Sequence, residues 1–513
     1  MREPENAQLS RRQGPPVEDD ESSVGMKILS SQERDLLVVA SNLREEHDAT
    51  RLNRRLYSRY HTQYISILHE RYHSLPDSFK EHFRATTETL PENGIPSKYF
   101  GAMAIIAEQL SDERVGQPCT LRSITDLLRV KGFLNVREVD GQGRGSGDEV
   151  AGQLVYILMG WVTLMFAPTL PTVVQEGPSR VQLAIEDDQD ENGVYLDSDT
   201  LIRHSVPFDE VSRLTLPTML KTFGRLIPCS EAPTDERQVF QVAGNAFAGR
   251  ILVSYINYRC LRKLSDINIV FTSAWSRHLE FDEFSRTIKI FKHPSACMVF
   301  CSGSVNRTAQ KRGLAATLFS HYFRSHDDDE GDYSSLHDES IDGVSFFREL
   351  LLTYRVIFGQ DGASAKLFRT EHEDLLSAFL TPHRIWHYLP WLRPLVLGRK
   401  PIRRQLSHSE VVDPLLLEVC GTQYTKAAIY RDLRAPSPRD QYLAAKEFPF
   451  FGDRLLKIQI FMQGEHPSDW KALINDRRDI LRYWTFWAVM VIGAISILQS
   501  AIANILGILQ VIY

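Results

Sequence analysis

The chain contains little cysteine and no large excess of charge of either sign. Only six of its 513 residues are cysteines, and its formal net charge at pH 7 is -6. So few cysteines exclude a small secreted scaffold held together by disulfides and favour a reducing compartment. The balance of charge gives no electrostatic reason to expect nucleic acid as a partner. What remains is a chain long enough to form two or three hydrophobic cores.

An apolar stretch is also missing from the N-terminus. Residues 1–25, MREPENAQLSRRQGPPVEDDESSVG, mix charge, proline and serine. This composition excludes a secretory signal, and it lacks the apolar side chains that a packed element needs. We therefore expect a disordered tail over residues 1–25.

The C-terminal segment lacks charge. No charged residue follows Arg482, and residues 486–512 exceed the roughly 20 apolar residues that a helix needs to cross a bilayer core. A buried core helix is the alternative, but such a helix usually has a charged face, so the pattern predicts a transmembrane helix. Aromatic rings and cations border the segment, as is typical at a membrane interface. The expected interface residues are Tyr483, Trp484, Trp487, Arg477, Arg478 and Arg482.

The cations before the helix predict a single-pass topology with the N-terminal body in the cytosol. Because nothing follows Tyr513, we expect residues 483–513 to be a tail anchor, and the lack of a terminal basic patch favours the endoplasmic reticulum or nuclear envelope. Small and polar residues recur along the helix at intervals of three and four. They form either a face that packs against another membrane helix or positions that an over-long span tolerates. These residues are Ser496, Ser500, Ala503, Asn504 and Gly507.

A second uncharged run, AGQLVYILMGWVTLMFAPTLPTVVQ, occupies residues 151–175. Pro168 and Pro171 interrupt it, because proline removes a helix hydrogen bond and clashes with the preceding turn. The remaining apolar stretch, 154–167, is shorter than a membrane span requires. We expect a buried core helix here, with a second membrane segment over 154–170 as the alternative.

The remaining patterns predict a mainly α fold with a small β element (α+β), plus one C-terminal transmembrane helix. Helical spacing covers most of 31–76, where Pro76 ends the pattern, and returns in VSFFRELLLTYRVIFG and FGDRLLKIQIFMQGE. Around DEFSR, β-branched and aromatic residues alternate as in a hairpin. The predicted organisation is a helical body (26–325) with a hairpin near 269–300, an acidic linker (326–340), a second helical part (341–470) and a basic juxtamembrane segment (471–482).

One short motif resembles a zinc site. HERYH contains His69, Glu70 and His73 in the H-E-x-x-H spacing, which would place two imidazole ligands on one helical face and use the glutamate as general base. A catalytic zinc needs a third protein ligand, and Phe79 stands where a metzincin has histidine. A solvated helix face is the favoured interpretation.

A second motif resembles a calcium loop. Asp188, Asp190, Asn192 and Asp199 have EF-hand offsets. Aspartate replaces the usual bidentate glutamate, and VQLAIE before the loop resembles a strand as much as a helix. We favour an acidic surface turn.

Other motifs are weaker still. GQGRGSG, residues 141–147, has the wrong glycine offsets for a dinucleotide or phosphate loop, which favours a linker. Cys297 and Cys301 lie four apart in a strand-like run without a second pair, so we expect buried apolar side chains. No G-x-S-x-G nucleophile elbow occurs in the sequence.

Several blocks of sequence together resemble a group of fungal proteins that end in a membrane segment. The resemblance implies a cytosol-facing body on a C-terminal anchor and implies no activity, substrate or catalytic residue. The blocks are GWVTLMFAP (160–168), LPTMLKTFGRLIP (216–228), RHLEFDEFSRTIKIFKHPSAC (277–297), DPLLLEVCG (413–421), FPFFGDRLLKIQ (448–459) and DRRDILRYWTFWAV (476–489).

The sequence therefore predicts a membrane-anchored interaction or scaffold protein that is not an enzyme. Its expected partners are membrane lipid, through the C-terminal helix, and a protein bound by the cytosolic body; no nucleic acid and no cofactor is expected. The alternative is an anchored zinc hydrolase that uses His69, Glu70 and His73.

Overall fold

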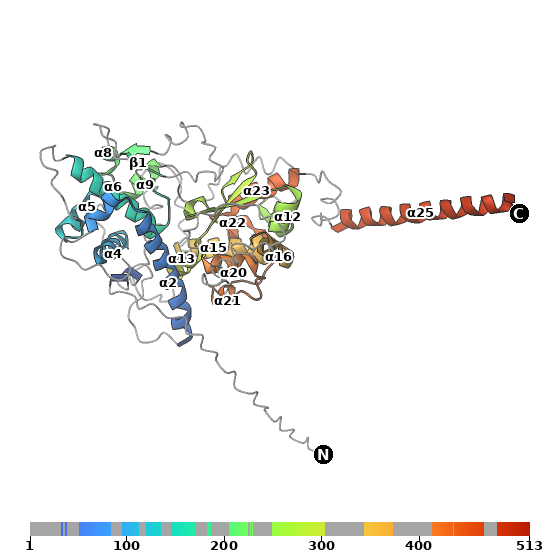
Figure 1. Ribbon diagram of the computed structural model, residues 1–513, viewed down its shortest axis with the longest axis horizontal. Coiled ribbons are helices and arrows are strands. Elements are labelled where there is room, and N and C mark those ends of the chain that lie inside the picture. The colour runs from blue at the N-terminus through green and yellow to red at the C-terminus, as the bar shows by residue number, and fades with distance from the viewer. Residues whose placement is uncertain are drawn as a thin grey trace, which may run out of the picture.

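The computed structural model is mainly helical with small sheets, which confirms the predicted fold class (Figure 1). The residues that it describes are 32–33, 36–37, 51–83, 95–111, 119–134, 145–170, 182–185, 205–223, 226, 228, 249–302, 343–372, 413–433, 435–465 and 480–512. The predicted disordered tail (1–25) and acidic linker (326–340) lie outside these residues.

The first part of the body, which we call the N-terminal lobe, comprises the described residues from 51 to 228. Its helices begin and end beside residues that favour helix ends, such as proline and capping hydroxyl side chains. α2 (Arg51–Ser74) stops two residues before Pro76, as predicted. A capping box starts α5 (Leu121–Val130), because Ser123 N–H donates to Thr120 Oγ1 at 3.0 Å while Thr120 N–H donates to Ser123 Oγ at 2.9 Å. The other elements are α3 (Asp77–Lys80), η1 (Glu81–Phe83), α4 (Ser97–Ser111), α6 (Gly145–Thr163), β1 (Gln182–Ala184), β2 (Ser205–Pro207), α8 (Phe208–Val211) and α9 (Leu216–Thr222).

Helix α6 lies at the centre of this lobe and decides between the two interpretations of the second uncharged run. Leu154 and Val162, near the two ends of its apolar part, are both fully buried, and so are most residues between them. α4 and α5 both pack against it. Residues 154–163 are therefore a core helix, as predicted, and the chain leaves it through Leu164, which has a positive φ of 51°.

The second part, the C-terminal lobe, comprises the described residues from 249 to 465. Two of its segments are distant in the sequence but adjacent in the fold, because β3 (Arg250–Leu252) pairs antiparallel with β7 (Gln441–Leu443). The other elements are α11 (Val253–Ile256), α12 (Tyr258–Leu264), β4 (Asn268–Thr272), η2 (Trp275–Arg277), β5 (Phe281–Asp282), β6 (Thr287–Phe291), α13 (Pro294–Ser302), α15 (Gly343–Tyr354), the π-helix η5 (Arg355–Gly359), α16 (Gly362–Glu371), α20 (Pro414–Gly421), α21 (Ala428–Asp432), α22 (Ala444–Glu447) and α23 (Gly452–Gly464).

The predicted hairpin is present, but the segment around it differs in two ways from the prediction. β5 and β6 form the antiparallel pair around the turn, and β4 joins the other edge of β6 in parallel register. From Pro294 onward the chain is the helix α13 and not a strand, so the strand-like interpretation of Cys297 and Cys301 was wrong. Proline is favoured in the first turn of a helix, and a short apolar run that is buried on several sides has no period that separates helix from strand.

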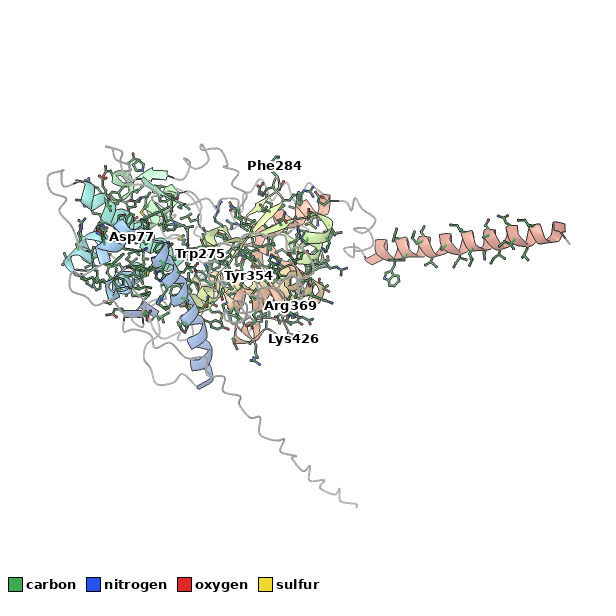
Figure 2. All side chains as sticks on the ribbon, in the orientation of Figure 1. Asp77, Trp275, Phe284, Tyr354, Arg369 and Lys426 are labelled. Carbon is green, nitrogen blue, oxygen red and sulfur yellow. The ribbon has the colours of Figure 1, made fainter. Side chains whose placement is uncertain are left out.

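The two lobes share one core. α2 packs against α13, and the rings of Tyr64 and Phe300 meet edge to face at 5.7 Å. The indole N–H of Trp275 in the C-terminal lobe donates to the carbonyl of Thr163 at the end of α6, at 2.8 Å. Figure 2 shows Trp275 inside the body, where the two lobes meet. Within its own lobe the Trp275 ring packs against Phe346 and Phe347, which holds the indole in place for its bond to Thr163.

Candidate functional site

Helix α25 (Ile480–Ile512) stands apart from the body (Figure 1). Its segment Trp484–Ile508 has 25 residues and a mean hydropathy of 2.0, and none of its most apolar window is buried. At about 1.5 Å per residue this length exceeds the roughly 30 Å of a bilayer core. Among the described residues, it is the one helix that is long and apolar enough to span a membrane. Large apolar side chains such as Ile497, which is 73% exposed, would contact water unless lipid or protein covers them.

The predicted interface residues fall at the start of this helix. Arg482, Tyr483, Trp484 and Trp487 lie in its first two turns, and Trp484 is exposed. Arg477 and Arg478 lie outside the described residues. An amphipathic ring beside an apolar helix is suited to the headgroup region, with its polar atom toward water.

The predicted packing face of α25 is also exposed along its length. The residues of this face are all exposed: Ser496, Ser500, Ala503, Asn504 and Gly507. The Ser496 hydroxyl donates to the Ile492 carbonyl of its own helix at 2.9 Å. That bond satisfies the hydroxyl within the helix, so Ser496 is compatible with lipid even without a second helix.

The HERYH motif lies on α2, but its side chains face different surroundings. His69 Nε2 lies 2.6 Å from Glu33 Oε1, and its ring packs 5.1 Å from that of Phe100. His73 is exposed, one turn further along the helix, and Glu70 is half-buried. The described residues contain no group of three or more His, Cys, Asp or Glu side chains that could hold a metal. The Glu33 carboxylate contacts His69 Nε2, which is the nitrogen that would bind a zinc ion in this motif. Nothing in the sequence predicts that these two residues meet.

The other two loop motifs lie mostly outside the described residues. Asp188, Asp190, Asn192 and Asp199 are all among the residues without a description, while the segment before them is the strand β1, not an entering helix. Of GQGRGSG, only residues 145–147 are described, and they form the first turn of α6.

A buried carboxyl on α15 holds the turn before α23. Glu349 is 4% exposed, and its Oε1 accepts the backbone N–H of Phe450 at 3.0 Å and that of Phe451 at 2.6 Å. Burial raises the pKa of this carboxyl to about 8, and the two backbone donors oppose that rise. At neutral pH the group is therefore largely neutral, with an oxygen that still accepts both hydrogen bonds.

A buried histidine connects η2, β6 and α15. Phe291 N–H donates to His278 Nδ1 at 3.1 Å, and therefore Nε2 carries the proton and donates to Thr353 Oγ1 at 2.7 Å. The Thr353 hydroxyl in turn donates a hydrogen bond to the Leu350 carbonyl. Desolvation, together with the nearby Arg454 guanidinium, lowers the pKa of His278 well below its usual value. A neutral imidazole with both nitrogens bonded inside the core is a structural group and not a general base open to substrate.

Asp413 connects α13 and α20. Its Oδ1 accepts from Leu415 N–H at 2.9 Å and from the Ser295 hydroxyl at 2.6 Å, and its Oδ2 accepts from Ser295 N–H at 2.7 Å. Asp413 is fully buried and is also the N-cap of α20. One side chain thus satisfies backbone donors at the start of two helices.

The π-helix η5 begins at a buried arginine, Arg355. Its guanidinium donates to the Pro436 carbonyl at 2.5 Å and lies 3.5 Å from the Tyr442 hydroxyl, and it packs 5.9 Å from the Tyr430 ring. Tyr442 also lines a surface hollow. Three cations and one carboxylate line that hollow, and the carboxylate of Glu447 pairs with Arg439 at 2.9 Å. The lining residues are Arg250, Arg439, Gln441, Tyr442, Leu443, Lys446 and Glu447.

These described polar side chains of the core thus form hydrogen bonds between segments that are distant in the sequence. Glu349, His278 and Asp413 each bond to backbone atoms and lie away from solvent. None of these three is placed beside the surface hollow. Comparisons with protein-family models, with curated proteins and with solved structures give no match.

Proposed function

We propose that this chain is a membrane-anchored protein whose folded body lies in the cytosol and binds a protein partner without catalysing a reaction. The observation that carries the proposal is the 25-residue apolar stretch of α25, whose most apolar window is not buried against the described body. Tethering would keep the body at one membrane surface, where a raised local concentration makes a modest affinity sufficient.

The orientation is supported by the cations that precede the helix. Arg477, Arg478 and Arg482 lie immediately before or at the first turn of α25, and positive charge beside a span favours the cytosolic side. The core is compatible with the same compartment, because Cys297 and Cys420 are buried there as thiols without a disulfide. Free thiols persist where glutathione keeps the surroundings reducing.

Removal of α25 tests the anchor. We expect the full-length chain to stay with the membrane pellet after alkaline carbonate extraction, and a chain lacking residues 480–512 to move to the supernatant. The reason is that about 20 or more apolar side chains lose their lipid environment together. Recovery of the full-length chain in the carbonate supernatant would contradict the proposal, and so would a shortened chain that stays in the pellet.

Glycosylation tests the orientation separately. Asn306-Arg307-Thr308 is the sole N-glycosylation sequon in the sequence. We expect no glycan on Asn306, because a cytosolic body never meets the lumenal transferase. The measurement is the electrophoretic mobility of the full-length chain from a eukaryotic host before and after endoglycosidase treatment. A mobility shift would place the body on the lumenal side and leave the anchor itself unaffected.

A further inference from the structure

The tip of the β5–β6 hairpin carries a phenylalanine that is wholly in water. Phe284 is 100% exposed, and Figure 2 shows it projecting from the surface of the C-terminal lobe. Hairpin turns usually carry glycine, asparagine, aspartate or serine. A solvent-facing ring forgoes roughly 1.5–3 kcal/mol of burial, a free energy that an apolar phase covering the ring would restore in part.

The turn that presents Phe284 is held by its own side chains. Asp282 Oδ1 accepts the Phe284 N–H at 2.9 Å, and Asp282 Oδ2 accepts the Ser285 hydroxyl at 2.6 Å. Bonding to Ser285 also lowers the pKa of the Asp282 carboxyl. A turn braced in this way keeps the ring projecting outward instead of folding back on the sheet.

This hairpin lies where the chain leaves the body toward α25. Arg286, two residues after Phe284, donates to Glu465 Oε1 at 3.0 Å, and Glu465 directly follows α23. The rings of Phe281 and Phe461 meet at 5.0 Å and pack the hairpin against the end of that helix. Residues 466–479 then lead to α25. At no more than about 3.6 Å per residue, they hold this side of the body within on the order of 50 Å of the membrane surface.

Most of the charged side chains near Phe284 form ion pairs. Ile460 on α23 is 44% exposed and lies one turn beyond Lys457, which pairs with Glu283 at 3.7 Å. Arg286 is paired with Glu465, as described above. The charged groups around the tip are the two cations Arg286 and Lys457 and the three carboxylates Asp282, Glu283 and Glu465. With no excess of positive charge, the ring itself, and not attraction to anionic lipid, has to supply any affinity for a bilayer.

We propose that Phe284 inserts into the interface of the same bilayer that holds α25 and gives the body a second membrane contact, which sets its orientation. The proposal rests on the anchoring proposed above. Phenylalanine is a common side chain on the membrane-facing side of interfacial elements, and a contact in the same molecule as the anchor needs little affinity of its own.

Photocrosslinking in the full-length chain tests this contact. The photoreactive residue p-benzoylphenylalanine is placed at position 284, 497 or 130, one at a time, and each protein is reconstituted into phosphatidylcholine vesicles. Position 497 lies in the span, and Val130, 86% exposed at the end of α5 in the other lobe, is the matched exposed control. We expect lipid adducts by mass spectrometry at 497 and at 284, with at least a fivefold lower yield at 130.

The three positions separate the failure of this inference from the failure of the anchor. Adducts at 497 with equal yields at 284 and 130 would overturn the contact and leave the anchor standing. No adduct at 497 would overturn the anchor, and the contact with it. Two further results would also contradict insertion of the ring: a yield at 284 that requires phosphatidylserine, and crosslinks from 284 to a protein instead of lipid in native membranes.

Discussion

Replacing Glu349 by alanine is expected to lower the free energy of unfolding by about 2–5 kcal/mol. The substitution leaves the N–H groups of Phe450 and Phe451 without an acceptor inside the core, and each unsatisfied buried donor costs about 1–3 kcal/mol. Chemical unfolding of the full-length chain in mild detergent, followed by intrinsic tryptophan fluorescence, to which the buried Trp275 contributes, measures the change.

The control for this prediction is Glu349→Gln, which keeps an oxygen at the same place. Glutamine Oε1 can accept both N–H groups, so we expect a loss well below that of the alanine variant. A glutamine variant as unstable as the alanine variant would show that accepting these two bonds is not what Glu349 contributes.

The same residue predicts how stability depends on pH. The carboxyl pKa is raised from 4.5 to about 8 in the folded chain, so between these values the folded state holds a proton that the unfolded state has released. The contribution of Glu349 is complete below about pH 4.5 and is lost as the pH rises through about 8. We expect the wild type to lose stability over this range more steeply than Glu349→Gln, which has no proton to lose.

Helices and their ends were predictable where residues close together in the sequence determine them. Proline disfavours continuation of a helix that precedes it, which predicted the end of α2 before Pro76. A run of apolar residues that is too short for a membrane and interrupted by Pro168 predicted the core helix α6. The CMVFC segment shows the limit of such reasoning. This segment is mostly buried, so its apolar residues do not alternate with polar ones at the spacing of a helix or of a strand. Its helical structure follows from the packing of α13 against α2 and α15, which the sequence does not reveal.

The candidate functional features also include some that depend on local sequence and others that depend on long-range contacts. α25 could be predicted from sequence because crossing a bilayer demands length and lack of charge, both of which are local properties. The pairing of His69 with Glu33 and the contacts of Glu349 could not be predicted, because each joins residues between 36 and 102 positions apart. A glutamate inside FFRELLL has the spacing of an ordinary polar helix face, and no signal in the sequence marks it as buried.

Replacing Asp413 by asparagine is expected to destabilise the chain almost as strongly as replacing it by alanine, by about 3–5 kcal/mol. Both carboxyl oxygens accept a backbone N–H, one from Leu415 and the other from Ser295. An asparagine has one oxygen and one NH2 group, so in either orientation an NH2 donor faces an N–H donor in a fully buried site.

The contrast with Glu349 makes this expectation specific. At position 349 Oε1 accepts both N–H groups, and Oε2 makes only a longer second contact of 3.2 Å with the Phe450 N–H, so an amide oxygen can keep both bonds. At position 413 the two backbone N–H groups bond to different oxygens, so an amide loses one of them. Ser295→Ala removes only the hydroxyl and is expected to cost about 1 kcal/mol, which separates loss of that bond from loss of the two backbone bonds. Unfolding measurements on the Asn, Ala and Ser295→Ala variants test the order. An Asp413→Asn chain as stable as the wild type would mean that α13 and α20 do not depend on two acceptors at this site.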